Sequence, residues 1–153
     1  IFSFQPVSTT HNAEIMANKA PFIAINSAFA VDLFGQVYAE ATPSGFMSGP
    51  GGASDFARGV KLAQAQGCQQ SLSIIALPST EGKSGAISRI IAPNTGVGPV
   101  SLGRRDVDLI VSENGIADLR GGTLRERAQN LIAIAADEHQ EVLKQSLHEY
   151  SWG

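Results

Sequence analysis

Short apolar segments recur along the first two thirds of the chain, and they predict β-strands. The run at residues 72–77 is apolar almost throughout and is bounded by Pro78, so we expect a central strand covered on both faces. Residues 30–34 and 37–39 alternate in polarity around Gly35 and Gln36, which predicts a hairpin. The predicted strands are residues 22–26, 30–34, 37–39, 72–77, 87–92 and 107–111.

Helical spacing of apolar residues takes over in other stretches and dominates the last third of the chain. Asn12 or Thr10 can cap the first predicted helix, and Ser54 or Asp55 can cap the second, which we expect to begin at Phe56. The sequence Thr123-Leu124-Arg125-Glu126 is a capping box that predicts the start of the third. The predicted helices are residues 13–18, 56–66, 124–135 and 137–150.

Strands interleaved with helices predict an α/β layered domain, with a largely parallel or mixed sheet flanked by helices. The chain has 153 residues and shows neither an internal repeat nor a low-complexity linker. We therefore expect residues 1–153 to form a single domain.

Composition excludes several classes of function. The chain has 43% hydrophobic and 16% charged residues and a net charge of -3, without a basic tract, so we expect no nucleic-acid partner. Its apolar runs are too short or too polar to span a membrane. No histidine or carboxylate cluster has metal-ligand spacing, so we expect no metal. The only cysteine, Cys68, permits no internal disulfide and suits a cytoplasmic location.

The N-terminus at Ile1 has neither an initiator methionine nor the pattern of a signal peptide. The chain starts in the middle of a polarity pattern. We therefore expect it to be a piece of a longer polypeptide.

A glycine-rich loop before the second predicted helix is the first candidate for ligand binding. It reads Ser48-Gly49-Pro50-Gly51-Gly52-Ala53-Ser54-Asp55-Phe56. Glycines let the backbone bring its own N–H groups close to an oxyanion or phosphate, and a helix N-terminus favours negative charge. The alternative is a tight surface turn that binds nothing.

A second candidate loop follows the predicted central strand, with the sequence Pro78-Ser79-Thr80-Glu81-Gly82-Lys83-Ser84-Gly85. Its hydroxyls, lysine and glycines suit phosphates or a pantetheine chain, although a solvated connection would have a similar composition. Neither a Walker motif nor GxGxxG is present, so an ATPase or a Rossmann dinucleotide binder is not indicated. Because α/β domains bind ligands at the carboxyl ends of their strands, we expect the two loops to lie side by side.

Several motifs in a fixed order resemble one family. They are Ile23-Ala24-Ile25-Asn26-Ser27-Ala28, Val31-Asp32-Leu33, Gly35-Gln36-Val37, the glycine loop through Arg58-Gly59, Ile74-Ile75-Ala76-Leu77-Pro78-Ser79-Thr80, Ile87-Ser88-Arg89-Ile90, Gly115-Ile116-Ala117-Asp118-Leu119-Arg120-Gly121 and Leu124-Arg125-x-Arg127-Ala128. Together they resemble the C-terminal domain of the acetyl-CoA hydrolase and CoA-transferase family, which includes 4-hydroxybutyrate, butyrate and succinate CoA-transferases. The resemblance runs from about His11 to the end of the first C-terminal helix.

The resemblance implies a ping-pong reaction of an acyl-CoA with a small carboxylate or water, through an acyl-glutamyl anhydride and a glutamyl-CoA thioester. It assigns the thioester oxyanion to the N–H of Gly52, with Gly51 beside it. It places Lys83 near CoA, in the loop that also offers Ser79 and Thr80. His11 and Asn12 straddle the position of an active-site asparagine, and which of the two takes that role is open.

The resemblance further implies CoA as substrate and product, a homo-oligomer, and an upstream N-terminal domain that carries the nucleophilic glutamate. No glutamate of this chain matches the nucleophile's motif, so we expect the fragment alone to fold but to be nearly inactive. Glu40, Glu81 and Glu113 are expected in ordinary surface or loop roles.

Ala53 and Pro50 depart from the family's usual residues, which leaves donor and acceptor preference and hydrolysis open. Two other functions fit the same residues. One is a non-catalytic CoA-binding or assembly module, and the other is a subunit of a related acyl-CoA lyase complex.

Overall fold

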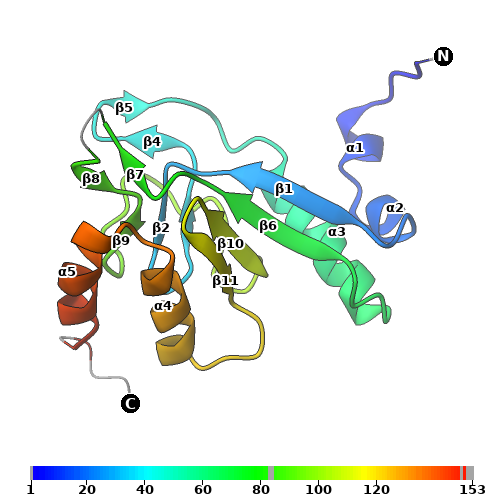
Figure 1. Cartoon of the computed structure of the whole chain (residues 1–153). Helices are drawn as coiled ribbons and strands as arrows, with labels where there is room; N and C mark the ends of the chain where they lie inside the picture. The colour runs from blue at the N-terminus through cyan, green and yellow to red at the C-terminus, as the bar shows by residue number, and fades with distance from the viewer. Residues whose placement is uncertain (1, 83–84, 149, 151–153) are drawn as a thin grey trace.

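The computed structural model describes residues 2–82, 85–148 and 150 and is built around a four-stranded sheet (Figure 1). The strands follow the order β1-β6-β10-β11, with β1, β6 and β10 parallel and β11 antiparallel to β10. The sheet is therefore mixed, and the predicted α/β class is confirmed. Its strands are β1 (Ile23–Ser27), β6 (Leu72–Ala76), β10 (Leu109–Ser112) and β11 (Gly115–Asp118).

Smaller sheets extend the fold beyond the main one. The predicted hairpin forms as β2 and β3, and β9 pairs with β2 to complete a three-stranded sheet. Two short hairpins, β4–β5 and β7–β8, lie on the upper left of the view in Figure 1. These strands are β2 (Ala30–Asp32), β3 (Val37–Tyr38), β4 (Ala41–Thr42), β5 (Gly45–Phe46), β7 (Thr80–Glu81), β8 (Ile87–Ser88) and β9 (Ile90–Ile91).

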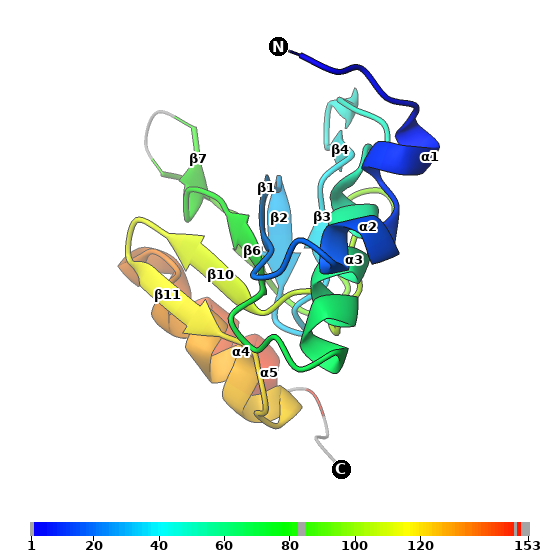
Figure 2. The ribbon, with the colours of Figure 1, turned by 90° about the vertical axis from the view of Figure 1, so that its right-hand side faces the viewer.

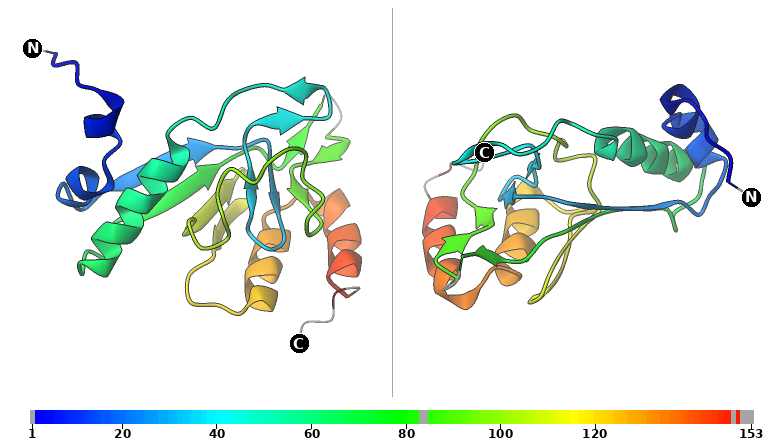
Figure 3. Two further views of the ribbon diagram at one scale, coloured as in Figure 1. Left: turned by 180° about the vertical axis from the view of Figure 1, so that it is seen from behind. Right: turned by 90° about the horizontal axis from the view of Figure 1, so that it is seen from above.

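The helices are α1 (Val7–Thr10), α2 (Ala13–Ala17), α3 (Ala53–Ala65), α4 (Leu124–Ala133) and α5 (Asp137–His148). Helix α3 packs on β1 and β6 and against α2, whereas α4 packs on β11 and against α5. Figure 2 and the rear view in Figure 3 show α3 and α4 on the same side of the main sheet. None of the helices in the described part of the chain is long and apolar enough to cross a membrane.

Two predicted helix caps are confirmed, and one is wrong. The hydroxyl of Thr123 accepts the N–H of Glu126, and the Glu126 carboxylate accepts the N–H of Thr123, which completes the capping box. Asn12 caps α2. Helix α3, however, begins at Ala53 instead of Phe56, with Gly52 at its N-cap and no side-chain cap. The carboxylate of Asp55 is instead engaged by Arg58, one turn further on, in an ion pair of 3.3 Å.

The hydrophobic core lies between the main sheet and the helices. Ile75 and Ile110 are paired neighbours on β6 and β10, and both are fully buried. They belong to one cluster with Ala57 of α3, Ala117 of β11 and Leu131 of α4. One continuous core therefore joins the two halves of the chain.

Strand β6 does not have the predicted coverage on both faces. Its residues alternate, with Ser73 and Ile75 buried and Leu72, Ile74 and Ala76 only partly buried. The helices cover the Ile75 side, and the other side carries no helix among the described residues. The uniformly apolar sequence of this strand is therefore not explained by the helices of this chain.

A buried carboxylate ties α3 to the sheet. Asp108, just before β10, accepts the side-chain N–H of Gln64 (2.9 Å) and the backbone N–H of Ser73 (2.9 Å), and it pairs with Lys61. Lys61 and Gln64 both lie on α3. The side chain thereby links three elements that are far apart in sequence.

A second buried carboxylate, Asp32, organises the β2–β3 hairpin. Its two oxygens accept the backbone N–H groups of Phe34, Gln36 and Asn94 at 2.9–3.0 Å, the Gln36 side-chain amide and the Tyr38 hydroxyl. Burial and the neighbouring Asp32 charge raise the pKa of Tyr38 to about 12, so its hydroxyl stays protonated. This network ties the hairpin turn to Asn94.

Candidate functional site

The glycine loop meets His11 at the start of α3. A methyl group on Gly52 would overlap the His11 imidazole and would lie 3.1 Å from the Phe56 ring. The imidazole stacks on Phe56 with the ring centroids 4.8 Å apart, and its Nδ1 hydrogen-bonds with the Thr10 hydroxyl at 2.9 Å. The fold thus brings together Gly52 and His11, two residues that the sequence nominated separately.

The two glycines of the pair are required for different reasons. Gly51 has a φ of +57°, in the left-handed region that favours glycine. Gly52 has an ordinary φ of -101°, so space, not backbone conformation, demands glycine there. From the sequence alone, glycine at position 52 is expected for both its backbone conformation and the free space left by the missing side chain. In the structure the His11 imidazole occupies the place where a Gly52 side chain would lie.

The N-terminus of α3 lies beside His11. Among the described residues no side chain caps this helix, so none accepts its first-turn N–H groups. A helix of this length also presents a partial positive charge at the same point. The arrangement can therefore stabilise an oxyanion.

Asn12 differs from His11 in what it contacts. Its side-chain oxygen accepts the N–H groups of Glu14 (2.9 Å) and Ile15 (3.1 Å) as the cap of α2. Of the two alternatives left open by the sequence, His11 is the residue whose side chain reaches the glycine loop.

The second candidate loop is held at its base by Glu113. This residue lies in the turn between β10 and β11, and its carboxylate accepts the Ser79 hydroxyl (2.5 Å) and the Ser79 N–H (2.8 Å). The amide of Asn114 donates to the same hydroxyl at 3.3 Å. These two hydrogen bonds from Ser79 lower the pKa of Glu113. We call the Ser79–Glu113 pair the loop clamp.

Ser79 is only 1% exposed, and its hydroxyl faces Glu113 and not the solvent. On either side of Ser79, Pro78 is exposed and Thr80 is partly exposed. Lys83 lies outside the described residues. At the far end of the loop, Nε2 of His139 on α5 hydrogen-bonds with the carbonyl of Gly85 at 2.9 Å. The loop is therefore anchored at both ends.

Sequence reasoning missed Glu113 and Asn114 as parts of the site. The available signal was their position directly after β10, a neighbour of β6, since the carboxyl ends of parallel strands meet at one edge.

We expect Glu113→Gln to destabilise the fold at neutral pH, because a neutral amide cannot accept both hydrogen bonds from Ser79 as a carboxylate does. The folded-state pKa of Glu113 is depressed, so its contribution is present above the ordinary value of 4.5 and is lost as pH falls through the lowered value. Chemical denaturation between pH 7 and pH 3 should show the two proteins converging in acid. Glu141→Gln, which removes an exposed ion pair with Lys144, is the control. A gap that stays constant across this range contradicts the loop clamp.

The two candidate loops lie on the same side of the molecule but are separated by the β4–β5 hairpin (Figure 1). A cavity of about 200 Å³ lies between this hairpin and the second loop. Its walls include Thr42 and Pro43 on one side and Ile87 and Arg89 on the other. The expected side-by-side arrangement is thus replaced by a hairpin and a cavity between the loops.

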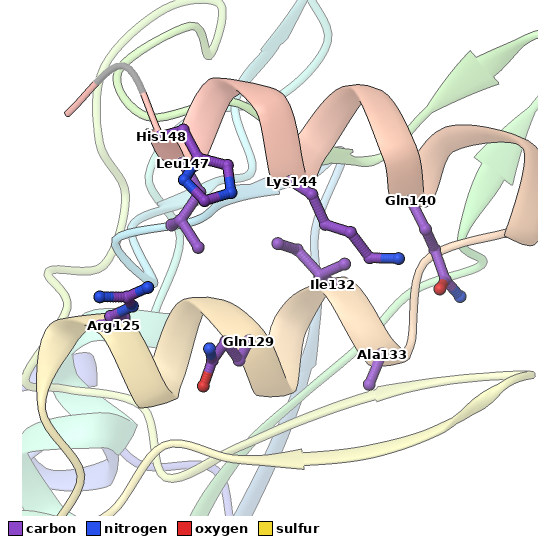
Figure 4. A pocket seen from close by; sticks show the side chains of 8 residues that line it. All are labelled: Arg125, Gln129, Ile132, Ala133, Gln140, Lys144, Leu147 and His148. Atoms are coloured by element: carbon purple, nitrogen blue, oxygen red, sulfur yellow. The ribbon is translucent and has the colours of Figure 1, made fainter.

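Two further cavities among the described residues are, like this one, lined by none of the site residues predicted from the sequence. A groove of about 350 Å³ separates α4 from α5, where Ile132 and Lys144 face each other (Figure 4). A second, polar cavity is lined by Gln36 and the Arg104-Arg105 pair. Among the described residues, no group of three or more His, Cys, Asp or Glu side chains could hold a metal ion.

Comparison with known proteins agrees on one family. A sequence profile of the acetyl-CoA hydrolase/transferase C-terminal domain matches residues 1–147. The chain is 39% identical over 137 residues to the 4-hydroxybutyrate coenzyme A transferase of Clostridium kluyveri, a match that covers 90% of this chain and 30% of that protein.

Two solved structures share the fold at similar identity. RipA from Yersinia pestis matches with a TM-score of 0.81 and 33% identity, over 94% of this chain and 31% of that one. The 4-hydroxybutyrate CoA-transferase from Porphyromonas gingivalis matches with a TM-score of 0.72 and 34% identity, over 95% of this chain and 31% of that one. The chain therefore spans less than a third of the length of these relatives. It belongs to the acetyl-CoA hydrolase and CoA-transferase family, of which it is a C-terminal domain.

Proposed function

We propose that this chain supplies the oxyanion-binding loop and the CoA contacts of a CoA-transferase or acetyl-CoA hydrolase. The observation that carries the proposal is the meeting of Gly52 and His11 at the uncapped N-terminus of α3. Preorganised backbone donors of this kind stabilise charge that develops on a thioester oxygen. Two of the relatives named above are 4-hydroxybutyrate CoA-transferases, which agrees with this chemistry.

In the proposed reaction a glutamate from outside this chain attacks the thioester carbonyl carbon. The carbonyl oxygen becomes an oxyanion, which the N–H of Gly52 stabilises, and the CoA thiolate leaves to give an acyl-glutamyl anhydride. The thiolate then attacks the glutamyl carbonyl, releases the carboxylate product and forms glutamyl-CoA. A second carboxylate reverses these steps in a transferase, or water resolves the thioester in a hydrolase.

His11 borders the reacting centre through its Nε2. When the Thr10 hydroxyl donates to Nδ1, the proton of the neutral imidazole resides on Nε2, which can then donate to the oxyanion or to a CoA carbonyl. Asn12 supports His11 from the next position by fixing the start of α2.

The loop at residues 78–85 contributes the CoA contacts in this proposal. The loop clamp fixes its base through Ser79, so that Thr80 and Lys83 can meet the pantetheine chain or a phosphate. Ser79 then acts by positioning the loop rather than by touching CoA itself.

The full-length protein should exchange CoA between acetyl-CoA and small carboxylates such as butyrate, succinate or 4-hydroxybutyrate, or should hydrolyse acetyl-CoA. Turnover is measured by the acyl-CoA products formed with each acceptor and with water alone. CoA binding without turnover would favour the non-catalytic module, and stable co-purifying subunits would favour the lyase complex. The absence of both CoA binding and turnover would contradict the proposal.

A further inference from the structure

One face of the main sheet carries a continuous apolar surface. Ile25 of β1 pairs with Ile74 of β6, which pairs in turn with Leu109 of β10, so the three side chains form a row across the sheet. Val111 of β10 and Ile116 of β11 are cross-strand partners in the next row. We call this surface the bare face, and its residues are Ile23, Ile25, Ile74, Leu109, Val111 and Ile116.

The exposure of these side chains is systematic. Ile23 is 52% exposed, Ile25 67% and Ile116 65%, and all three point to the side of the sheet opposite α3 and α4. Their neighbours on the helical side, such as Ile75 and Ile110, are fully buried. Because strand residues alternate between faces, this contrast identifies one uncovered face rather than scattered apolar residues.

Such a surface is unusual for parallel strands, which are normally covered on both faces. A contiguous apolar patch on a folded domain marks an interface. Strand β1 is also an edge strand, with one side of its backbone unpaired in the described structure. The apolar face and the unpaired edge of β1 both indicate that another polypeptide segment covers the sheet on the β1 side.

We propose that polypeptide preceding residue 1 in the full-length protein packs on the bare face. The chain covers only 30% of the length of its Clostridium kluyveri relative and matches the C-terminal domain of the family, so such a protein has ample further chain to cover it. The first helices, α1 and α2, lead into the start of β1, the strand at the open edge of the sheet, and α2 packs against α3 (Figures 1 and 3).

The chemistry of the surface defines the covering segment. All six residues of the bare face are uncharged and aliphatic, and the polar residues Ser27 of β1 and Asp118, which pairs with Leu109, lie on the same side of the sheet at its borders. The covering segment must therefore present an apolar helix or strand face. The proposal rests on family membership and on this geometry, and it does not depend on the proposed acyl-CoA chemistry.

Cysteine alkylation in the full-length protein tests the proposal. Ile25→Cys and Ile116→Cys are placed on the bare face, and Val142→Cys, on α5 with 66% exposure, is the matched control. The modified peptide is quantified by mass spectrometry for the native protein and for the guanidinium-unfolded protein. Circular dichroism checks that each variant is folded.

We expect both bare-face cysteines to react at least about tenfold more slowly in the native than in the unfolded protein, because burial blocks access to the thiol. The Val142→Cys thiol should stay within about threefold of its unfolded rate. The protection should survive about a hundredfold dilution, since an intramolecular contact does not depend on concentration.

Two results would overturn the proposal. Unfolded-like reactivity at position 25 or 116 would show that the face stays open. Protection that disappears on dilution would show that a second copy of the chain covers it. Acyl-CoA turnover is measured separately, so loss of activity with intact protection would count against the proposed function alone.

Discussion

Replacement of Gly52 by valine in the full-length protein is expected to lower kcat by about a hundredfold or more, since losing one oxyanion donor costs on the order of 3 kcal/mol. The structure gives the reason. Any Cβ at this position overlaps the His11 imidazole, which is itself held by Phe56 and Thr10. The added side chain must displace either His11 or the Gly52 backbone from the α3 N-terminus. Steady-state kinetics with acetyl-CoA measures the effect.

Gly49→Ala is the matched control from the same loop. A methyl group on Gly49 would meet no described atom within 4 Å, and its backbone is not in the left-handed region. This variant should keep kcat within a few-fold of the wild type. If folded Gly52→Val does the same, the oxyanion role is wrong and the glycine loop is a turn.

Asp32→Ala should strongly destabilise the fold, with a loss of roughly 3 kcal/mol or more in the free energy of unfolding. Asp32 is fully buried and accepts hydrogen bonds from the backbone of Phe34, Gln36 and Asn94 and from two side chains. Alanine leaves these donors in a space that the carboxylate filled. Urea denaturation of wild type and variant measures the difference.

The control for this change is Asp55→Ala. Its carboxylate is partly exposed and pairs with an exposed Arg58 on the same helix, an interaction worth less than about 1 kcal/mol. A loss for Asp32→Ala no larger than that for Asp55→Ala would show that the hairpin network does not hold the fold together.

Local patterns were enough to predict the main elements. Strands β1, β6 and β10, the β2–β3 hairpin and the long helices follow from apolar periodicity and from caps such as Thr123. The prediction failed where the bounds of a strand depend on the strand with which it pairs. The 87–92 run splits into β8 and β9 because its first half forms a hairpin with β7, whereas its second half pairs with β2, which is distant in sequence.

The candidate site was predictable in its residue types but not in its contacts. The glycine pair and the 78–85 loop stand out in the sequence because few other segments combine glycine and hydroxyl residues after a strand. The clamp between Ser79 and Glu113 depends on β6 and β10 being neighbours, which only the sheet order reveals. The contact of His11 with Gly52 depends likewise on how α1 and α2 pack beside α3.

The turn between β10 and β11 consists of Glu113 and Asn114 alone. Hairpin turns usually tolerate insertions, because they project into solvent and carry few contacts. Here an added residue would rotate the carboxylate away from Ser79 and release the base of the 78–85 loop. For protein engineering, this turn is therefore a poor site for an affinity tag or a fused domain, whereas the β4–β5 turn at Pro43 and Ser44, which is free of such a clamp among the described contacts, is the better choice.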